Sequence, residues 1–299
     1  HPGRPRRESI TSEVMAAPPR LHYRSRMNAN TMVGELLRDW RRKRRLSQLE
    51  LACAAEISTR HLSFLETGRS RPSREMILRL AERLAIPLRG RNALLVAAGF
   101  APVYPERRLD DPALEPARRA IDLVLAGHEP YPALAVDRHW TLVAANRAVA
   151  PLLEGVATAL VQPPVNVLRL SLHPEGLAPR IANLSEWRAH VLERLRQQIE
   201  ATADDVLEAL HAELAALPAP DGYREEAGKA AAYAGVVVPM RLRTPAGVLS
   251  FFSTTTVFGT PVDVTLSELA IEAFFPADRA TAEALRALAD AANAQAGST

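Results

Sequence analysis

A short polar segment in the first third of the chain carries side chains that can read DNA bases. It begins after Ser58 and contains two leucines, Leu62 and Leu65, at helical spacing. With 3.6 residues per turn, the leucines share one face and the polar side chains lie on the other. The residues on the outer face are the polar Thr59, Arg60 and Ser63 and the aromatic Phe64. Arginine can donate two hydrogen bonds to guanine, and threonine can contact a base edge or a thymine methyl group. We therefore expect this helix to enter a DNA major groove.

Short helices must position that segment, and the sequence marks their ends. Ser47 is a predicted N-cap with Glu50 as its capping-box partner, and Ser58 is a second N-cap eleven residues later. Gly68 ends the helix that Ser58 begins, as a residue just beyond the C-cap does. Ser73 is a third N-cap. Apolar spacing predicts one helix before Ser47 and another over about Leu88–Ala98.

This part of the chain, Val33–Ala98, resembles the helix-turn-helix of the XRE family, the lambda and 434 repressor type. The resemblance is carried by these residues: Ser47-Gln48, Leu51-Ala52, Ile57-Ser58, Leu62-Ser63 and Glu66 with Gly68. It implies an all-α lambda-repressor-like domain over residues 32–99 that binds a double-stranded DNA operator. The segment differs from the family pattern at one position, because Glu56 stands where the turn usually has glycine. If the backbone there needs a positive φ, glutamate costs on the order of 1 kcal/mol.

The resemblance also implies a role for each position. Gln48 would grip a backbone phosphate, and Arg41 and Glu66 would form an ion pair that locks the first helix to the third. The residues at the base-facing helix and the phosphate-contacting loop after it give the full predicted DNA-binding set: Gln48, Ser58, Thr59, Arg60, His61, Ser63, Phe64, Arg69, Arg71 and Ser73. Single helix-turn-helix modules usually bind as dimers, so we expect a homodimer, joined through the second domain.

Charge divides the chain in the same way. Residues 1–91 contain 20 Lys and Arg against 9 Asp and Glu, whereas residues 92–299 contain 17 against 25. A basic end joined to an acidic remainder indicates a polyanion partner for the first part only. Within it, His1–Arg26 is rich in Arg and Pro and has no periodicity, and Met27 is a candidate native start. Residues 1–31 are therefore expected to be a basic arm, a tag or a disordered segment, and a basic arm can reach a minor groove.

The remainder of the chain predicts an α+β domain. Residues 100–128 read as a linker with a connecting helix over Leu114–Ala126, and residues 129–299 as the second domain. Apolar alternation predicts an antiparallel sheet of about five strands. The predicted strands are Ala133–Val136, Trp140–Ala145, Val236–Leu242, Leu249–Thr256 and Thr265–Phe274. Helices are predicted over Leu184–Ala201 and Ala280–Ala294.

The order of motifs along both domains, from about Met32 to Arg286, resembles that of the MmyB-like transcription regulators. The first domain closes with Ser73-Arg-Glu-Met76, Arg91-Asn-Ala-Leu-Leu95 and Ala97-Ala-Gly-Phe-Ala-Pro102. The motifs of the second domain are Glu129-Pro-Tyr-Pro132, Asp137-Arg-His-Trp140, Ala145-Asn146, Asn166-x-Leu-Arg169, His173-Pro174, Glu186-Trp187, Phe258-Gly-Thr-Pro with Asp263, and Phe275-Pro-Ala-Asp278. The resemblance implies a PAS-like domain that binds a fatty acid or a similar lipid, with no obligatory cofactor. The implied protein is a bacterial, cytoplasmic, nucleoid-associated regulator that responds to a ligand.

Candidate ligand residues follow from the chemistry of an acyl chain, which needs a dry apolar wall and a cation or N–H donors at its carboxylate. Arg169, His173 and Arg194 are candidates for the head group, and Trp187, Met240, Phe251 and Ile271 for the wall. Two alternatives stay open. The arginines can be solvated or in structural salt bridges, and the whole domain can be a ligand-free dimerisation or protein-interaction module with a sealed core.

An enzyme is not expected, because the chain has no GxSxG, HExxH, P-loop, GxGxxG or CxxC motif. Glu268 and Glu272 lie four apart on one predicted strand, where an exposed face is the favoured interpretation over acid–base chemistry. The eight histidines show no metal-ligand spacing, and Cys53, the single cysteine, excludes an internal disulfide. No apolar run approaches the roughly 18 residues of a membrane span, so no membrane insertion is expected.

Overall fold

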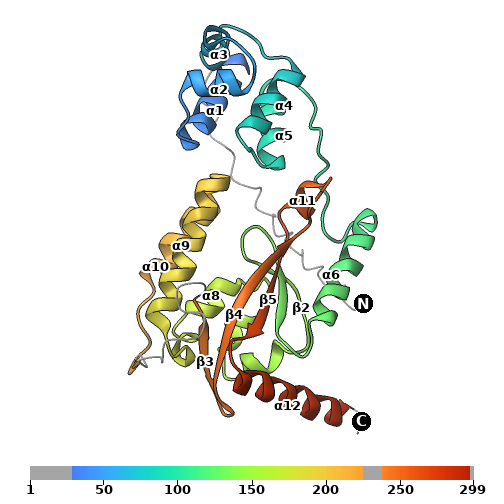
Figure 1. Ribbon diagram of the computed structural model, residues 1–299, viewed down its shortest axis with the longest axis vertical. Coiled ribbons are helices and arrows are strands. Elements are labelled where there is room, and N and C mark those ends of the chain that lie inside the picture. The colour runs from blue at the N-terminus through green and yellow to red at the C-terminus, as the bar shows by residue number, and fades with distance from the viewer. Residues whose placement is uncertain (1–28, 225–237, 297–299) are drawn as a thin grey trace, which may run out of the picture.

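The chain forms two domains, joined by an extended linker (Figure 1). A computed structural model describes residues 29–224 and 238–296. The expected arm of residues 1–31 therefore lies almost entirely outside the described residues, and so does Val236, the first residue of a predicted strand.

The first domain consists of short helices closed by the predicted serine caps. The helices are α1 (Ala29–Lys43), α2 (Gln48–Ala54), α3 (Thr59–Glu66), α4 (Arg74–Arg83) and α5 (Leu88–Ala97). The hydroxyls of Ser47, Ser58 and Ser73 each accept a hydrogen bond from the backbone N–H three residues on, and the Ser47–Glu50 capping box is complete. Gly68 has a φ of +71°, as its place beyond the end of α3 predicts.

The helices of this domain enclose one apolar core. Its largest fully buried side chains are Leu37, Leu51, Leu62, Leu65, Ile77, Leu80, Leu84, Ile86, Leu94 and Leu95. The helix α1 crosses α3 very closely at Gly34, where an added Cβ would lie 2.4 Å from the carbonyl oxygen of Leu65. A side chain at Gly34 would therefore push α3 away from the core.

The linker leads into a short 3-10 turn, Pro112–Leu114, and then into α6 (Glu115–Gly127). This is the connecting helix that the sequence predicts. Its buried side chains Ile121 and Leu125 pack on one face of the sheet, together with Ala133, Ala135 and Ile271.

The second domain is built on one antiparallel sheet of five strands, in the order β2-β1-β5-β4-β3. The strands are β1 (Ala133–Val136), β2 (Leu142–Ala145), β3 (Met240–Thr244), β4 (Gly247–Val257) and β5 (Ala270–Pro276). The predicted fold class, a helical DNA-binding domain followed by an α+β domain with about five antiparallel strands, is confirmed. The strand predicted over Thr265–Phe274 is wrong in its first half. There, Asp263 accepts a hydrogen bond from the Thr265 N–H and begins a helical turn, α11 (Val264–Ser267).

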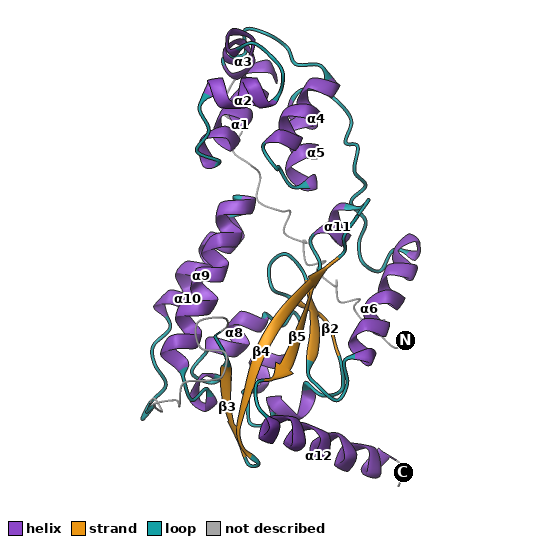
Figure 2. Cartoon of the chain, viewed as in Figure 1, coloured by secondary structure: helices purple, strands orange, loops and turns teal. Residues whose placement is uncertain are grey.

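Helices cover both sides of the sheet (Figure 2). Opposite α6 lie α8 (Val167–Leu172), α9 (Leu184–Thr202) and α10 (Asp205–Ala216), preceded by a short α7 (Thr158–Val161). The last helix, α12 (Arg279–Ala296), packs near the end of the sheet where β3 and β4 join. Because strand side chains alternate between faces, Ile271 points to the α6 side while its neighbour Glu272 points to the α9 side.

Candidate functional site

The helix α3 presents the predicted DNA-reading residues at the surface. Ser58, Arg60 and His61 are exposed, and Thr59, Ser63 and Phe64 are partly exposed. On the opposite face, Leu62 and Leu65 are fully buried in the core. The serine cap holds the N-terminal turn in helical form, so the side chains that precede and follow it project from a fixed backbone.

Phe64 organises two arginines on this face. The guanidinium of Arg60 lies 5.3 Å from the centroid of the Phe64 ring, and that of Arg69 lies 6.0 Å from it. Cation–π contacts of this kind hold a guanidinium in place without using its N–H groups. Both arginines therefore keep their donors for bases and phosphates, which are the partners that the sequence predicts for them.

Gln48 and Glu66 connect the DNA-facing helices with the core. Arg41 donates from Nε and Nη2 to the two carboxylate oxygens of Glu66, at 2.6 and 2.8 Å, which confirms the expected ion pair. Gln48 donates from Nε2 to Oε2 of the same carboxylate at 2.8 Å. Burial by itself raises the pKa of Glu66, but the hydrogen bonds from Arg41 and Gln48 outweigh it, so the pKa lies below its usual range. The amide of Gln48 is thus oriented by Glu66.

The loop after α3, which the sequence predicts to contact phosphates, also has a structural role. Arg69 is exposed, but Arg71 donates from Nη2 to the carbonyl of Ala98 at 3.3 Å and lies over the Phe100 ring. This contact joins the loop to the end of α5, so Arg71 has a structural role in addition to any phosphate contact. Ser73 caps α4 through its hydroxyl oxygen, and its O–H donates to the side chain of Glu75.

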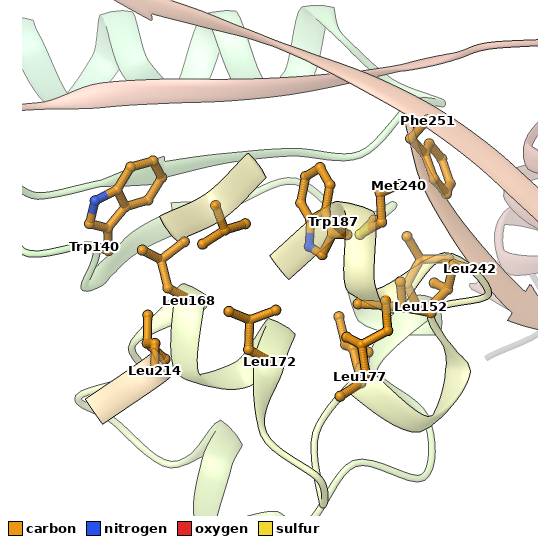
Figure 3. Packing of buried hydrophobic residues seen from close by; sticks show 14 of the residues in the cluster. Trp140, Leu152, Leu168, Leu172, Leu177, Trp187, Leu214, Met240, Leu242 and Phe251 are labelled. Atoms are coloured by element: carbon orange, nitrogen blue, oxygen red, sulfur yellow. The ribbon is translucent and has the colours of Figure 1, made fainter. Parts of the chain in front are cut away.

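The second domain contains an apolar cavity of about 110 Å³ between the sheet and helices α8 and α9. Figure 3 shows its surroundings, with Trp187, Met240 and Phe251 close together and Leu168 and Leu172 below them. These three candidate wall residues line the cavity, and each is buried. The indole N–H of Trp187 donates to the hydroxyl of Ser171 at 2.9 Å, so this polar group is satisfied inside the domain.

The polar side chains of the cavity gather where α9 faces β4 and β5. Arg194 lines the cavity, as predicted, and forms an ion pair with Glu272, whose side chain is only 4% exposed. The interpretation of Glu272 as part of an exposed strand face is therefore wrong. Glu268, which the sequence placed on the same strand as Glu272, lies at the end of α11 instead. His190 also lines the cavity, and burial, followed by the nearby Arg194 charge, lowers the pKa of its imidazole.

Three predicted ligand residues lie elsewhere. Arg169 is exposed and forms an ion pair with Glu213 at 2.6 Å, and His173 accepts a hydrogen bond at Nδ1 from the backbone of Glu175. Ile271 faces α6, on the other side of the sheet. The structure places none of the three at the cavity, because the short helix α8 turns Arg169 outward and the strand alternation turns Ile271 away.

Sequence reasoning missed His190, Ser253 and Glu272 at the cavity. His190 could have been found, because Trp187, His190 and Arg194 share one face of a helix at spacings of three and four. Glu272 could not, since a charged residue beside an apolar one in a strand predicts an outward side chain. Only the pairing of Glu272 with an arginine from a distant helix makes its burial acceptable.

The two domains contact each other through arginines of the first domain. Arg44, which follows α1, donates to the carbonyls of Glu200 and Ala201 in the last turn of α9 at 3.2 and 3.0 Å. Arg89 of α5 donates to both oxygens of Glu268 at 2.8 and 2.9 Å. The same helix α9 that lines the cavity therefore ends against the DNA-binding domain, as Figure 1 shows.

Within residues 29–224 and 238–296, no group of three or more His, Cys, Asp or Glu side chains is arranged to hold a metal ion. In the same residues, no helix has the length and apolarity to cross a bilayer.

A helix-turn-helix domain with an exposed reading helix, followed by a domain with an enclosed apolar cavity, defines a DNA-binding transcription regulator with a ligand-binding domain. Comparison with protein families supports both halves. Residues 37–90 match the helix-turn-helix family, and residues 117–288 match the MmyB-like transcription regulator ligand binding domain. Since the second match covers more than half of the chain, the protein belongs to the MmyB-like transcription regulator family.

No curated protein is significantly similar to the chain. Among solved structures, the clp gene regulator ClgR from Corynebacterium glutamicum is similar at 27% identity over 25% of this chain and 92% of its own, with a TM-score of 0.22. A second ClgR structure matches at 25% identity over 35% of this chain and 97% of its own, also with a TM-score of 0.22. An RNA-binding light-oxygen-voltage receptor matches at 16% identity over 87% of this chain and 64% of its own, with a TM-score of 0.24. With TM-scores this low, we draw no conclusion from these likenesses.

Proposed function

We propose that the protein is a sequence-specific transcription regulator whose DNA affinity responds to a hydrophobic small molecule of the fatty-acyl type. The observation that carries the proposal is the combination, in one chain, of an N-capped helix with free arginine donors and an apolar cavity in a domain of the MmyB-like family. We further propose that the second domain is PAS-like, which its five-stranded antiparallel sheet supports.

The proposed DNA interface uses α3 for the bases and its surroundings for the phosphates. Arg60, stacked on Phe64, is the proposed reader of guanine. Gln48, Arg69 and the N-terminus of α4 at Ser73 are the proposed phosphate contacts. The operator is double-stranded DNA, and a homodimer on two half-sites about one helical turn apart is the usual arrangement for a single module of this kind.

The proposed ligand site is the cavity between the sheet and α9. Its lining is apolar apart from Ser171, His190, Arg194, Ser253 and Glu272, as is usual for small-molecule sites. Burial of an alkyl chain there would contribute about 0.8 kcal/mol per CH₂ group. At about 110 Å³ the cavity is close to an engineered cavity of roughly 150 Å³ that binds benzene, so in this form it suits a short chain.

The proposed link between the sites is α9. Trp187, His190, Val191 and Arg194 of this helix line the cavity, and the carbonyls of its last turn accept from Arg44 of the DNA-binding domain. A ligand that displaces α9 would change this contact. Such a ligand alters DNA affinity only if it prefers one arrangement of the two domains, which is the condition for allosteric coupling. The protein is proposed to act at the bacterial nucleoid in the cytoplasm, as a binding protein and not an enzyme.

Two measurements test the proposal. An operator is first selected from a randomised DNA library, and the protein's affinity for it is compared with that for unrelated DNA at several salt concentrations. Native mass spectrometry of the protein as purified, repeated after denaturation, then reports bound ligand and subunit number. Extra mass that is lost on denaturation supports the ligand site. Specific DNA binding together with no ligand, and no thermal shift across an acyl series, would favour a ligand-free dimerisation module instead.

A further inference from the structure

The charged groups of the cavity compensate each other. Arg194 donates from Nη1 to Oε2 of Glu272 at 2.9 Å and from Nη2 to Oε1, and Nη2 also donates to the Thr255 hydroxyl at 2.6 Å. Thr255 in turn donates to Oε1 of Glu272 at 2.9 Å. The guanidinium also lies over the Trp140 ring, 4.7 Å from its centroid. In this cluster, the single cation of the lining is already matched by a carboxylate that is almost fully buried.

A carboxylate ligand would therefore add a second negative charge beside Glu272. Like charges placed together away from water repel strongly, because the surroundings screen them poorly. The arginine cannot neutralise both, since it carries one positive charge. An anionic head group is thus disfavoured at the place where the sequence suggested that Arg194 would receive one.

The cavity also contains uncharged hydrogen-bonding groups that have no hydrogen-bond partner among the described residues. The imidazole of His190 and the hydroxyl of Ser253 both line it, and neither side chain makes a hydrogen bond to any other described residue. The His190 ring lies tilted beside that of Trp187, with ring centroids 5.4 Å apart, and burial lowers the pKa of His190, which favours the neutral imidazole. A neutral imidazole can donate and accept, and so can a hydroxyl.

The periods of α9 and β4 place His190 and Ser253 on the same two faces as Arg194 and Thr255, nearer the end of the sheet where β3 and β4 join. The hydrogen bond between Arg194 and Thr255 joins α9 to β4 beside the cavity. Both elements end toward the DNA-binding domain, α9 at Arg44 and β4 beside the strand end that follows α11. Four residues toward the N-terminus of α9 from Arg194 correspond to a rise of about 6 Å. Two residues toward the start of β4 from Thr255 correspond to about 6.7 Å. These steps lead to His190 and Ser253, on the faces that carry Arg194 and Thr255.

We propose that the cavity selects a hydrophobic ligand with an uncharged polar end, such as an amide, an alcohol or an ester, over the corresponding carboxylate. The alkyl part lies among Trp187, Met240 and Phe251, and the polar end meets His190 and Ser253 below the Arg194–Glu272 pair. This inference rests on the proposed function and names the ligand class of the same site.

Hexanamide and hexanoate test the inference, because they have the same shape and differ in charge. Isothermal titration calorimetry of the full chain at pH 7.5 should show hexanamide binding at least about tenfold more tightly than hexanoate. Equal or tighter binding of hexanoate would overturn the inference while leaving the ligand site in place. If neither compound binds, and the octyl and decyl members of both series also fail, the proposed function of this domain is overturned along with the inference.

Variants identify the groups responsible. Glu272→Gln removes the negative charge but keeps the shape, so the preference should reverse toward hexanoate. The matched control is Glu213→Gln, which removes the same charge from the Arg169 pair outside the cavity. Should Glu272→Gln fail to fold, Ser253→Ala and His190→Leu provide a second test, since each should weaken hexanamide several-fold and leave binding of hexane unchanged. An unchanged hexanamide affinity in both variants would overturn the assigned position of the polar end.

Discussion

The guanidinium of Arg44 donates a hydrogen bond to the main-chain carbonyl of Ala201 at 3.0 Å, across the boundary between the two domains. Arg44 also donates to the carbonyls of Leu84 and Ala85, at the end of α4. One side chain therefore binds the ends of two helices, one from each domain. A cation at a helix C-terminus is stabilising because it complements the partial negative charge of the unpaired carbonyls.

The first prediction concerns this contact. Arg44→Ala should reduce the change in operator affinity that a saturating ligand causes, because it removes the hydrogen bonds that Arg44 donates to the last turn of α9. Coupling free energies are typically about 1–3 kcal/mol, so the variant should lose a measurable part of such a value. The ratio of the operator dissociation constants measured with and without ligand reports this coupling. Arg42→Ala, an exposed neighbour on α1, is the control. An unchanged ratio in Arg44→Ala would remove this contact from the proposed link.

The second prediction concerns the buried pair of Arg41 and Glu66. Arg41→Met should destabilise the first domain by about 3–5 kcal/mol, because Glu66 then lacks its counter-charge in the core. The pKa of Glu66 is lowered in the folded state, so the pair stabilises fully above the usual carboxyl pKa, and this contribution is lost as the pH falls through the lowered value.

Denaturant unfolding between pH 7 and pH 3 measures the pH effect. The wild type should lose more stability over this range than Glu66→Gln, whose amide does not titrate. Glu82→Gln, exposed on α4, should follow the wild type. Parallel pH curves for the wild type and Glu66→Gln would contradict the assignment of this dependence to Glu66.

The third prediction separates base reading from phosphate contact. Arg60→Ala should weaken binding to the selected operator by about 1–3 kcal/mol and relax its sequence preference, with little effect on unrelated DNA. Arg69→Ala and Gln48→Ala should weaken binding to the operator and to unrelated DNA about equally. Arg69→Ala should also reduce the dependence of the DNA affinity on salt concentration. Electrophoretic mobility shifts with both DNAs provide the values. Equal losses on both DNAs in Arg60→Ala would reject Arg60 as a base reader.

The fourth prediction concerns Glu56, in the turn between α2 and α3. Its φ of +56° lies in the left-handed region, where a side chain is strained and glycine is not. Glu56→Gly should therefore raise stability by up to about 1 kcal/mol. Glu82→Gly is the matched control, because the same substitution inside α4 should lower stability by about 0.5–1 kcal/mol. Thermal unfolding distinguishes the two, and a lower melting temperature for Glu56→Gly would contradict the strain argument.

Local signals predicted the first domain almost completely. The serine caps, the capping box at Glu50 and the left-handed Gly68 are all set within a few residues of the chain, because hydrogen bonds across one helical turn decide them. The sequence left the positive φ at Glu56 open, and the structure shows it. The sequence alone also predicted the strand Ala133–Val136 at its observed bounds, from apolar residues between turn residues.

Contacts between distant segments were decided only by the tertiary structure. Glu272 is read as exposed from its strand alone, yet it is buried because Arg194, 78 positions away in the chain, folds over it. Ile271 and Arg169 have suitable types for a ligand site but face away from the cavity, since the sheet and α8 orient them. Local hydrogen bonds and helical periodicity, read from the sequence by itself, thus determined the capped helices of the first domain, and the sequence motifs carried the family resemblance that implied the class of protein. The tertiary structure determined the cavity, its balanced charge and its connection to the DNA-binding domain, because each depends on which helix packs on which face of the sheet.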